Sequence, residues 1–354
     1  MRGVSRRTFC AALAAGAAGL LAGCAAGAGG PASDSGLVGA SSGEDVDGAS
    51  SVVTAEGVRE LVELDVDEEG LMRLDDAHVS PDPATVTGTV LTAEVTPRER
   101  QCLYLWEEGR APTTTARALG GSDPAGFRPT VTSVPVPVGT EVRGAVLLCA
   151  GGAFAFRGDN ADCYPTAAEL SQRGYQCFVV DYRLRPYTQA EGGVDLARAI
   201  RFVRAHASEL GLPDERCIAV GGYSAGGILC GETLINWAGH VTPDALDPSY
   251  APDELDLVSV DASADAMVYS FYGRLSVASL DGEALRAAGL PPTYYCYGTR
   301  DPFYDQFEAQ VQLMAKLGYD VRARVLDGWP HGFGALGGWI EEFDDFMQEA
   351  FARA

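Results

Sequence analysis

The sequence predicts an α/β fold with a doubly wound, mostly parallel central sheet flanked by helices. From about residue 131, short β-rich runs alternate with helical stretches. Several of the runs are almost continuously apolar, as expected of parallel strands that are buried on both faces. Alternation of this kind favours right-handed crossovers within a single sheet.

The expected strands are interspersed with expected helices along this part of the chain. The expected strands are residues 130–136, 145–149, 176–180, 217–220, 266–271, 293–297 and 321–326. The expected helices are residues 164–173, 193–210, 225–238, 304–317 and 339–354. In the second helix, apolar residues recur at helical spacing with Arg198, Arg201 and Arg204 between them, which predicts an amphipathic helix against the sheet.

The composition is that of a folded, strongly acidic protein. Of 354 residues, 47% are hydrophobic and 21% charged, so a buried core is expected. The formal net charge of −23 disfavours nucleic acid as a partner, because binding it needs a basic surface that neutralises phosphates. The nine cysteines form no CxxC pair and no Cys/His cluster, so we expect no metal site.

The N-terminus has the features of an export signal. Arg6 and Arg7 lie in a segment that resembles a twin-arginine signal, and an apolar stretch too short to cross a bilayer follows at 11–23. The stretch ends in Leu-Ala-Gly-Cys, which looks like a bacterial lipobox with Cys24 as the lipidated residue. A plain cleavage site or a chance cysteine are the alternatives. We therefore expect residues 1–23 to be a signal peptide.

This signal predicts a membrane-anchored lipoprotein on the outer side of the cytoplasmic membrane. Residues 24–51 consist mainly of small and acidic residues and are expected to be a flexible tether. Because residues 1–23 hold three arginines and no acidic residue, their removal changes the net charge from −23 to −26.

Residues 52–130 are expected to be an N-terminal elaboration packed on the main domain, residues 131–354. Residues 61–66 and 85–95 are β-like. Four cysteines lie in apolar runs and are expected to be buried thiols: 149, 177, 217 and 296. A disulfide between Cys102 and Cys163 is left open.

A Gly-x-Ser-x-Gly motif at 222–226 follows the apolar run 217–220 and opens the next helix. Glycines let a strand and a helix approach closely at such a turn, and the helix N-terminus lies beneath negative charge that develops at the serine. This context predicts that Ser224 is a nucleophile. A second match at 39–43, around Ser41, lacks a neighbouring strand or helix and is attributed to composition.

A serine hydroxyl needs a base to act as a nucleophile near neutral pH. His331 lies in the glycine-rich loop 328–334, directly after the last expected strand. His206 lies on an arginine-rich helix, and His240 follows the expected helix 225–238 that begins at the Ser224 turn. His78 belongs to the N-terminal region. The loop position predicts His331 as the base.

The acid that orients the histidine should lie between serine and histidine in chain order. Asp301 does so, just after an expected strand, whereas Asp305 lies a helical turn further on. Its carboxylate would fix the imidazole tautomer and stabilise the imidazolium. The alternative role of Asp301 is an N-cap for the next helix, because proline follows it.

The glycines after the strand 145–149 are candidates for an oxyanion hole. Backbone N–H groups of Gly151 and Gly152, together with that of Ala225, would face a tetrahedral oxyanion.

These segments together resemble the α/β-hydrolase fold and, within it, the carboxylesterases related to acetyl esterases and hormone-sensitive lipase. The resemblance extends from about residue 100 to the C-terminus. Residues 150–153, Ala-Gly-Gly-Ala, stand where the family has His-Gly-Gly-Gly or Pro-Gly-Gly-Gly, and 182–186, Tyr-Arg-Leu-Arg-Pro, match its Tyr-Arg-Leu-Ala-Pro. The elbow, the Asp301 loop and the Pro-His-Gly-Phe loop match as well. Alanine at 150 and 153 departs from the family pattern, but the backbone N–H of an alanine can still donate to an oxyanion.

The resemblance implies a serine carboxylesterase for short-chain acyl (acetyl-like) esters, with acylated sugars as candidate substrates and no cofactor. A peptidase or an arylformamidase on the same fold is the alternative within hydrolases. A non-catalytic binding lipoprotein is the alternative outside them. The oligomeric state is not indicated.

The acyl preference depends on the segment where this fold often carries a lid. Residues 239–265 hold few bulky apolar side chains, so little apolar surface is available to cover a long acyl tail. Phe154 and Phe156 are expected either to wall a short acyl pocket or to pack in the core. We therefore expect a preference for acetyl to butyryl esters.

Overall fold

The computed structural model describes residues 61–63, 83–115, 122–123 and 126–354. The expected signal peptide 1–23 and tether 24–51 lie outside the described residues. So do Cys24, Ser41 and His78.

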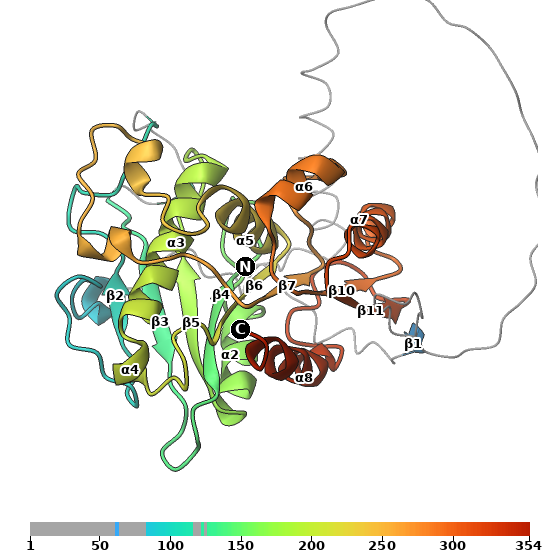
Figure 1. The fold of residues 1–354 in the computed structure, drawn as a ribbon, viewed down its shortest axis with the longest axis horizontal. Coiled ribbons are helices and arrows are strands. Elements are labelled where there is room, and N and C mark those ends of the chain that lie inside the picture. Colours follow the sequence, from blue (N-terminus) through green and yellow to red (C-terminus); the bar gives the residue numbers. More distant parts are fainter. Residues whose placement is uncertain (1–60, 64–82, 116–121, 124–125) are drawn as a thin grey trace, which may run out of the picture. The chain divides into compact units, whose positions relative to one another are not determined.

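Within the described residues, nine strands form one sheet in the order β1-β11-β10-β7-β6-β4-β5-β3-β2 (Figure 1). Their bounds are β1 Leu61–Glu63, β2 Cys102–Tyr104, β3 Thr130–Val134, β4 Gly144–Cys149, β5 Tyr175–Asp181, β6 Ile218–Tyr223, β7 Ala264–Val268, β10 Thr293–Gly298 and β11 Val321–Asp327. Neighbouring strands are parallel except at the β2–β3 and β3–β5 pairs. The expectation of a mostly parallel sheet is confirmed.

Helices cover both faces of the sheet. The bounds are α2 Cys163–Gln172, α3 Gln189–Ala205, α4 Ala207–Leu210, α5 Ala225–Asn236, α6 Gly282–Ala288, α7 Tyr304–Lys316 and α8 Trp339–Phe351. Helices α2 and α8 pack together on one face, and α3, α5 and α6 lie on the other (Figure 1). Every residue of β4, β5, β6, β7 and β10 is buried, which explains their nearly continuous apolar sequences.

Several element bounds differ from the expected ones. Strand β7 ends at Val268, and the next residues form the turn that carries Tyr269. Helix α3 starts earlier than expected, at Gln189, because Thr188 and Glu191 form a capping box there. Helix α6 and the hairpin β8 Gly273–Arg274 with β9 Val277–Ala278 were not predicted.

The N-terminal region contributes strands to the sheet. Within 52–130, β1 pairs with β11 at one edge and β2 pairs with β3 at the other. The β-like interpretation of 85–95 is wrong: Pro83–Thr85 is a 3-10 helix, and only Thr89 forms a single bridge, to Tyr104.

The three arginines of α3 are buried rather than solvated, and they hold the segment 239–261, which we call the strap. Arg198 pairs with Asp253 at 2.6 Å and with Asp256 at 3.0 Å. Arg201 and Arg204 donate to backbone carbonyls of the strap. The segment expected as a lid is thus held on α3. Among the described residues, no hydrogen bond or ring contact joins the strap to Ser224, His331 or Asp301.

The cysteines of the described residues are all buried and free. They are Cys102, Cys149, Cys163, Cys177, Cys217, Cys230 and Cys296. The expectation of buried thiols is confirmed, and the Cys102–Cys163 disulfide does not form.

Candidate active site

The parallel strands bring their carboxyl ends to one edge of the sheet, and the candidate site lies there. Ser224 stands between β6 and α5 with φ 49° and ψ −117°, a strained conformation for a residue other than glycine. Its N–H donates to the Val268 carbonyl at 3.0 Å, which ties the turn to the neighbouring strand. The elbow predicted around Ser224 is therefore present.

The glycines of the elbow are required by close backbone approach. A Cβ at Gly226 would lie 1.9 Å from the Cys149 carbonyl oxygen, and a Cβ at Gly222 would lie 2.3 Å from the Gly226 carbonyl carbon. Both distances are far below van der Waals contact. The motif therefore lets α5 begin directly against the end of β4.

The structure brings the three predicted catalytic residues together in one chain of hydrogen bonds. His331 Nε2 lies 2.9 Å from Ser224 Oγ, and His331 Nδ1 lies 2.6 Å from Asp301 Oδ2. The Asp301 side chain is fully buried, the His331 side chain is 8% exposed, and Ser224 is half-buried. One end of this chain is thus shielded from water and the other is open to it.

Asp301 does not cap the next helix. Helix α7 begins at Tyr304 with Phe303 as its N-cap. The second carboxylate oxygen of Asp301 accepts from the Phe303 N–H at 2.9 Å, which fixes the carboxylate toward His331. The competitor Asp305 is exposed on α7.

The other described histidines lie elsewhere. His206 pairs with Glu209, and His240 Nδ1 lies 2.9 Å from the Leu257 carbonyl. Neither has a hydrogen bond to Ser224 or Asp301 among the described residues.

One predicted oxyanion donor is otherwise engaged. The Gly151 N–H donates to Asp162 Oδ2 at 2.8 Å, so it does not face the nucleophile. Gly152 follows with φ 133°, a backbone conformation that favours glycine. The Ala225 N–H is at the first position of α5, where no carbonyl of the helix itself accepts it. Gly151 therefore does not fit the expected role, whereas Gly152 and Ala225 stay candidates for it.

Two residues that the sequence analysis did not single out, Asp162 and Tyr269, lie beside the site. The Tyr269 hydroxyl donates to Asp162 Oδ1 at 2.6 Å, and its ring centroid lies 4.8 Å from that of His331. Burial raises the pKa of Asp162 to about 6. The one available signal was an acidic residue close behind the glycine turn, and that pattern is unspecific.

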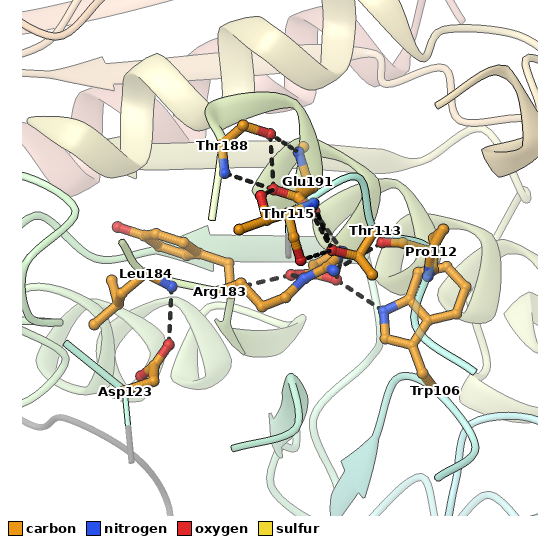
Figure 2. A network of polar contacts seen from close by, with 12 residues as sticks. Trp106, Pro112, Thr113, Thr115, Asp123, Arg183, Leu184, Thr188 and Glu191 are labelled. Carbon is orange, nitrogen blue, oxygen red and sulfur yellow. Dashed lines mark hydrogen bonds and ion pairs between the residues drawn. The ribbon is translucent and has the colours of Figure 1, made fainter. Parts of the chain in front are cut away.

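A polar network supports the loop that follows β5 (Figure 2). Arg183 pairs with the buried Asp195 at 2.9 Å and donates to the Pro112 carbonyl at 2.8 Å. The Arg185 N–H donates to the Phe154 carbonyl at 3.0 Å. This loop is therefore tied to residues of the N-terminal region. It is also tied to the loop that follows β4 and holds Gly151 and Gly152, which we call the glycine loop.

Glu191 forms the second half of the same network, as Figure 2 shows. Its carboxylate accepts hydrogen bonds from both the backbone and the side chain of Thr115, at 3.1 and 2.6 Å, and from the Thr188 N–H at 2.7 Å. The segment 112–115 is thereby fixed to the start of α3.

Aromatic side chains line the histidine side of the site. The Phe303 ring centroid lies 5.8 Å from that of His331, and Phe271 packs on Phe303 at 6.1 Å. Phe154 is 8% exposed and packs edge-on against Tyr182, which supports its role in the core.

Comparisons with known proteins agree with this architecture. A family described as having the alpha/beta hydrolase fold matches residues 146–335. Esterase LipC of Mycobacterium tuberculosis is 30% identical over 164 residues, which are 45% of this chain and 36% of LipC. Probable carboxylic ester hydrolase LipM of the same organism is 33% identical over 103 residues, 29% of this chain and 22% of LipM. The chain thus spans about a third of the length of LipC and about a fifth of the length of LipM.

A solved structure extends the likeness over most of the chain. It is the acetyl ester-xyloside bifunctional hydrolase of Caldicellulosiruptor lactoaceticus, with a TM-score of 0.54 and 19% identity. The match covers 74% of this chain and 98% of that one. At this identity, the likeness concerns the fold.

Proposed function

Because the chain belongs to the family with the alpha/beta hydrolase fold, we propose that it is a serine carboxylesterase that hydrolyses short-chain acyl esters. The observation that carries this proposal is the hydrogen-bonded sequence Ser224–His331–Asp301 at the carboxyl edge of the sheet. The two mycobacterial relatives named as esterases support the same class.

The reaction follows from the positions of these atoms. His331 Nε2 accepts the proton of Ser224 Oγ while that oxygen attacks the ester carbonyl. Asp301 holds Nδ1–H and stabilises the imidazolium that forms. The N–H groups of Gly152 and Ala225 stabilise the negative oxygen of the tetrahedral intermediate.

The intermediate collapses when the C–O bond to the alcohol breaks. His331 gives its proton to the leaving alkoxide, and an acyl group remains on Ser224. Water then attacks the acyl group with His331 as base, and the carboxylic acid leaves with Ser224 restored. No net proton or electron is gained by the protein.

The acyl group should be short. A long tail gains about 0.8 kcal/mol for each CH₂ that is buried, and this gain needs an apolar cover. The strap is held on α3. The segment between β7 and β10 consists of loops, the β8–β9 hairpin and the seven-residue helix α6. The large apolar side chains that these two segments leave exposed are Val241 and Leu257 in the strap and Val277 and Leu280 after β7, a scattered set rather than a continuous apolar cover.

We therefore expect kcat/KM for p-nitrophenyl esters to be highest between acetate and butyrate and to fall with longer chains. The measurement is the series from acetate to palmitate under one set of conditions. A maximum at eight carbons or more would move the proposal to a lipase, and faster cleavage of matched anilides would move it to an amidase.

The alcohol part of the substrate should be neutral. The net charge of −23, or −26 without residues 1–23, repels anionic polymers. An acylated neutral sugar therefore fits this surface better than an acidic polysaccharide.

We also propose that the protein is exported and anchored in the membrane through a lipid on Cys24. Support comes from Arg6, Arg7 and the apolar stretch that ends in Leu-Ala-Gly-Cys. In the part of the chain that the structure describes, no helix has the length and apolar character to span a bilayer.

Exchange of Cys24 for alanine is expected to release the protein from membranes or to block its processing, because the acylation site is lost. Replacing Arg6 and Arg7 with lysine is expected to hold the precursor inside the cell. Fractionation with an antibody to the folded domain measures both effects. Recovery of the wild type in the soluble cytoplasmic fraction would contradict the proposal.

A further inference from the structure

A buried carboxylate links two loops of the site that are far apart in the sequence. Asp162 Oδ2 accepts from the Gly151 N–H at 2.8 Å, and Asp162 Oδ1 accepts from the Tyr269 hydroxyl at 2.6 Å. The Tyr269 oxygen in turn accepts from the Gly334 N–H at 3.2 Å. The glycine loop after β4 is thus joined to the histidine loop after β11.

The linkage lies directly beside the reacting groups. A Cβ at Gly151 would lie 3.1 Å from Ser224 Cβ and 3.2 Å from Asp162 Oδ2. The Gly151 backbone therefore occupies the space between nucleophile and carboxylate. On the other side, the Tyr269 ring packs against His331, with their centroids 4.8 Å apart.

Asp162 is a costly residue for the stability of the fold. It is fully buried, and desolvation raises its pKa from 3.8 to about 6. A carboxyl group with a raised pKa favours the folded state at low pH, and this contribution is lost as the pH rises through about 6. At pH 8, the charged Asp162 thus destabilises the protein, and residues that do so next to an active site are typical of function.

We infer that Asp162 and Tyr269 are positioning residues that lock the glycine loop and the histidine loop around Ser224. By taking the Gly151 N–H, Asp162 turns the following peptide so that the Gly152 N–H faces the oxyanion. Through Tyr269 it also fixes the loop that carries His331. This inference rests on the proposed esterase function and adds two residues to it.

The first test is Asp162→Asn at pH 8. The amide can accept from Gly151 through one oxygen, but its NH₂ group cannot accept from Tyr269. We expect kcat to fall ~10- to 100-fold, as for a small displacement of reacting groups, while KM changes little. The affinity for a trifluoromethyl ketone, whose Ser224 adduct places an oxyanion in the hole, should fall in parallel with kcat/KM. The melting temperature should stay equal or rise, because a buried charge is removed.

A second variant, Tyr269→Phe, keeps the ring against His331 and removes only the hydroxyl. Like Asp162→Asn, it should lower kcat and change KM little. The double variant should lose less than the product of the two single losses, because both changes break one network. This variant also keeps the inference testable if Asp162→Asn fails to fold.

The chain offers a matched control in Asp265. This residue is also fully buried, burial raises its pKa to about 7, and the Tyr272 hydroxyl donates to it at 2.8 Å. It lies near the start of β7, whereas Tyr269 follows the end of that strand, a separation of roughly 13 Å along an extended chain. We expect Asp265→Asn to raise the melting temperature at pH 8 and to leave kcat unchanged.

The pH profile gives an independent readout. The titratable groups that face Asp162 are Tyr269 after β7, His331 after β11, Tyr223 on β6 and Cys163 on α2. Below about pH 6, protonation removes one acceptor from Asp162, so the acid limb of wild-type kcat/KM should contain the titration of Asp162. In Asp162→Asn the limb should be less steep.

Three results would overturn the inference. The first is an unchanged kcat in both Asp162→Asn and Tyr269→Phe. The second is an equal loss of kcat in the control Asp265→Asn. The third is a loss of kcat that is proportional to a fall in melting temperature across the variants. The rate at which a fluorophosphonate labels Ser224 gives the same comparison without an ester. If the wild type labels rapidly but cleaves no ester, the proposed substrate class fails while the positioning roles are still decided by the labelling rates.

Discussion

Replacing Ser224 with alanine is expected to remove nearly all ester hydrolysis, with kcat lower by roughly 10⁴- to 10⁶-fold. The change takes away the oxygen that lies 2.9 Å from His331 Nε2, and the remaining donors can stabilise an oxyanion only when another nucleophile attacks. Alanine has nearly the size of serine, so the strained turn at φ 49° should persist. Steady-state rates with p-nitrophenyl acetate and a thermal melt measure the two effects separately.

The control for this experiment is Ser41, which lies in the second Gly-x-Ser-x-Gly match, where the sequence predicts no neighbouring strand or helix. Ser41→Ala should leave kcat unchanged. Retention of more than a few per cent of activity in Ser224→Ala, with normal melting, would show that another residue is the nucleophile.

The second large effect is expected for Asp301→Asn, at about 10⁴-fold in kcat. The asparagine NH₂ group would donate to His331 Nδ1, which leaves the ring proton on Nε2. That tautomer cannot accept the Ser224 proton, so the base is lost although the geometry is kept. KM should change little, because the Asp301 side chain is fully buried beneath the histidine.

The matched control is Asp305→Asn. Asp305 lies four residues further on and is exposed in the first turn of α7. It should keep wild-type rates. Equal losses in the two variants would mean that the charge of this loop matters rather than the orientation of His331.

Most of the fold could be predicted from the sequence because its signals are local. Strands that are buried on both faces have nearly continuous apolar sequences. Accordingly, β4 and β6 begin within one residue of their expected starts. The elbow was equally visible, since a glycine is needed wherever α5 meets the backbone of β4. The partners of Ser224 could be predicted as well. Asp301 and His331 each follow an expected strand, and the chain has only four histidines from which to choose.

The remaining features depend on tertiary contacts that leave no periodic pattern. The arginines of α3 have the spacing of a solvated face, yet Arg201 is fully buried because Asp256 and strap carbonyls satisfy it. The loss of Gly151 as an oxyanion donor depends on Asp162, eleven residues later, folding back beneath it. Neither pairing is encoded in a motif.

The seven cysteines of the described residues, all of them buried, affect how long the protein stays active in oxidising surroundings. Attack by an oxidant needs an exposed thiolate, and burial raises the pKa of Cys163, Cys230 and Cys296 well above the ordinary value. In the native state these cysteines are therefore inert. Each unfolding event, however, exposes many thiols at once, and a single wrong disulfide would prevent refolding. The lifetime of the enzyme under such conditions is then set by its unfolding rate rather than by its equilibrium stability.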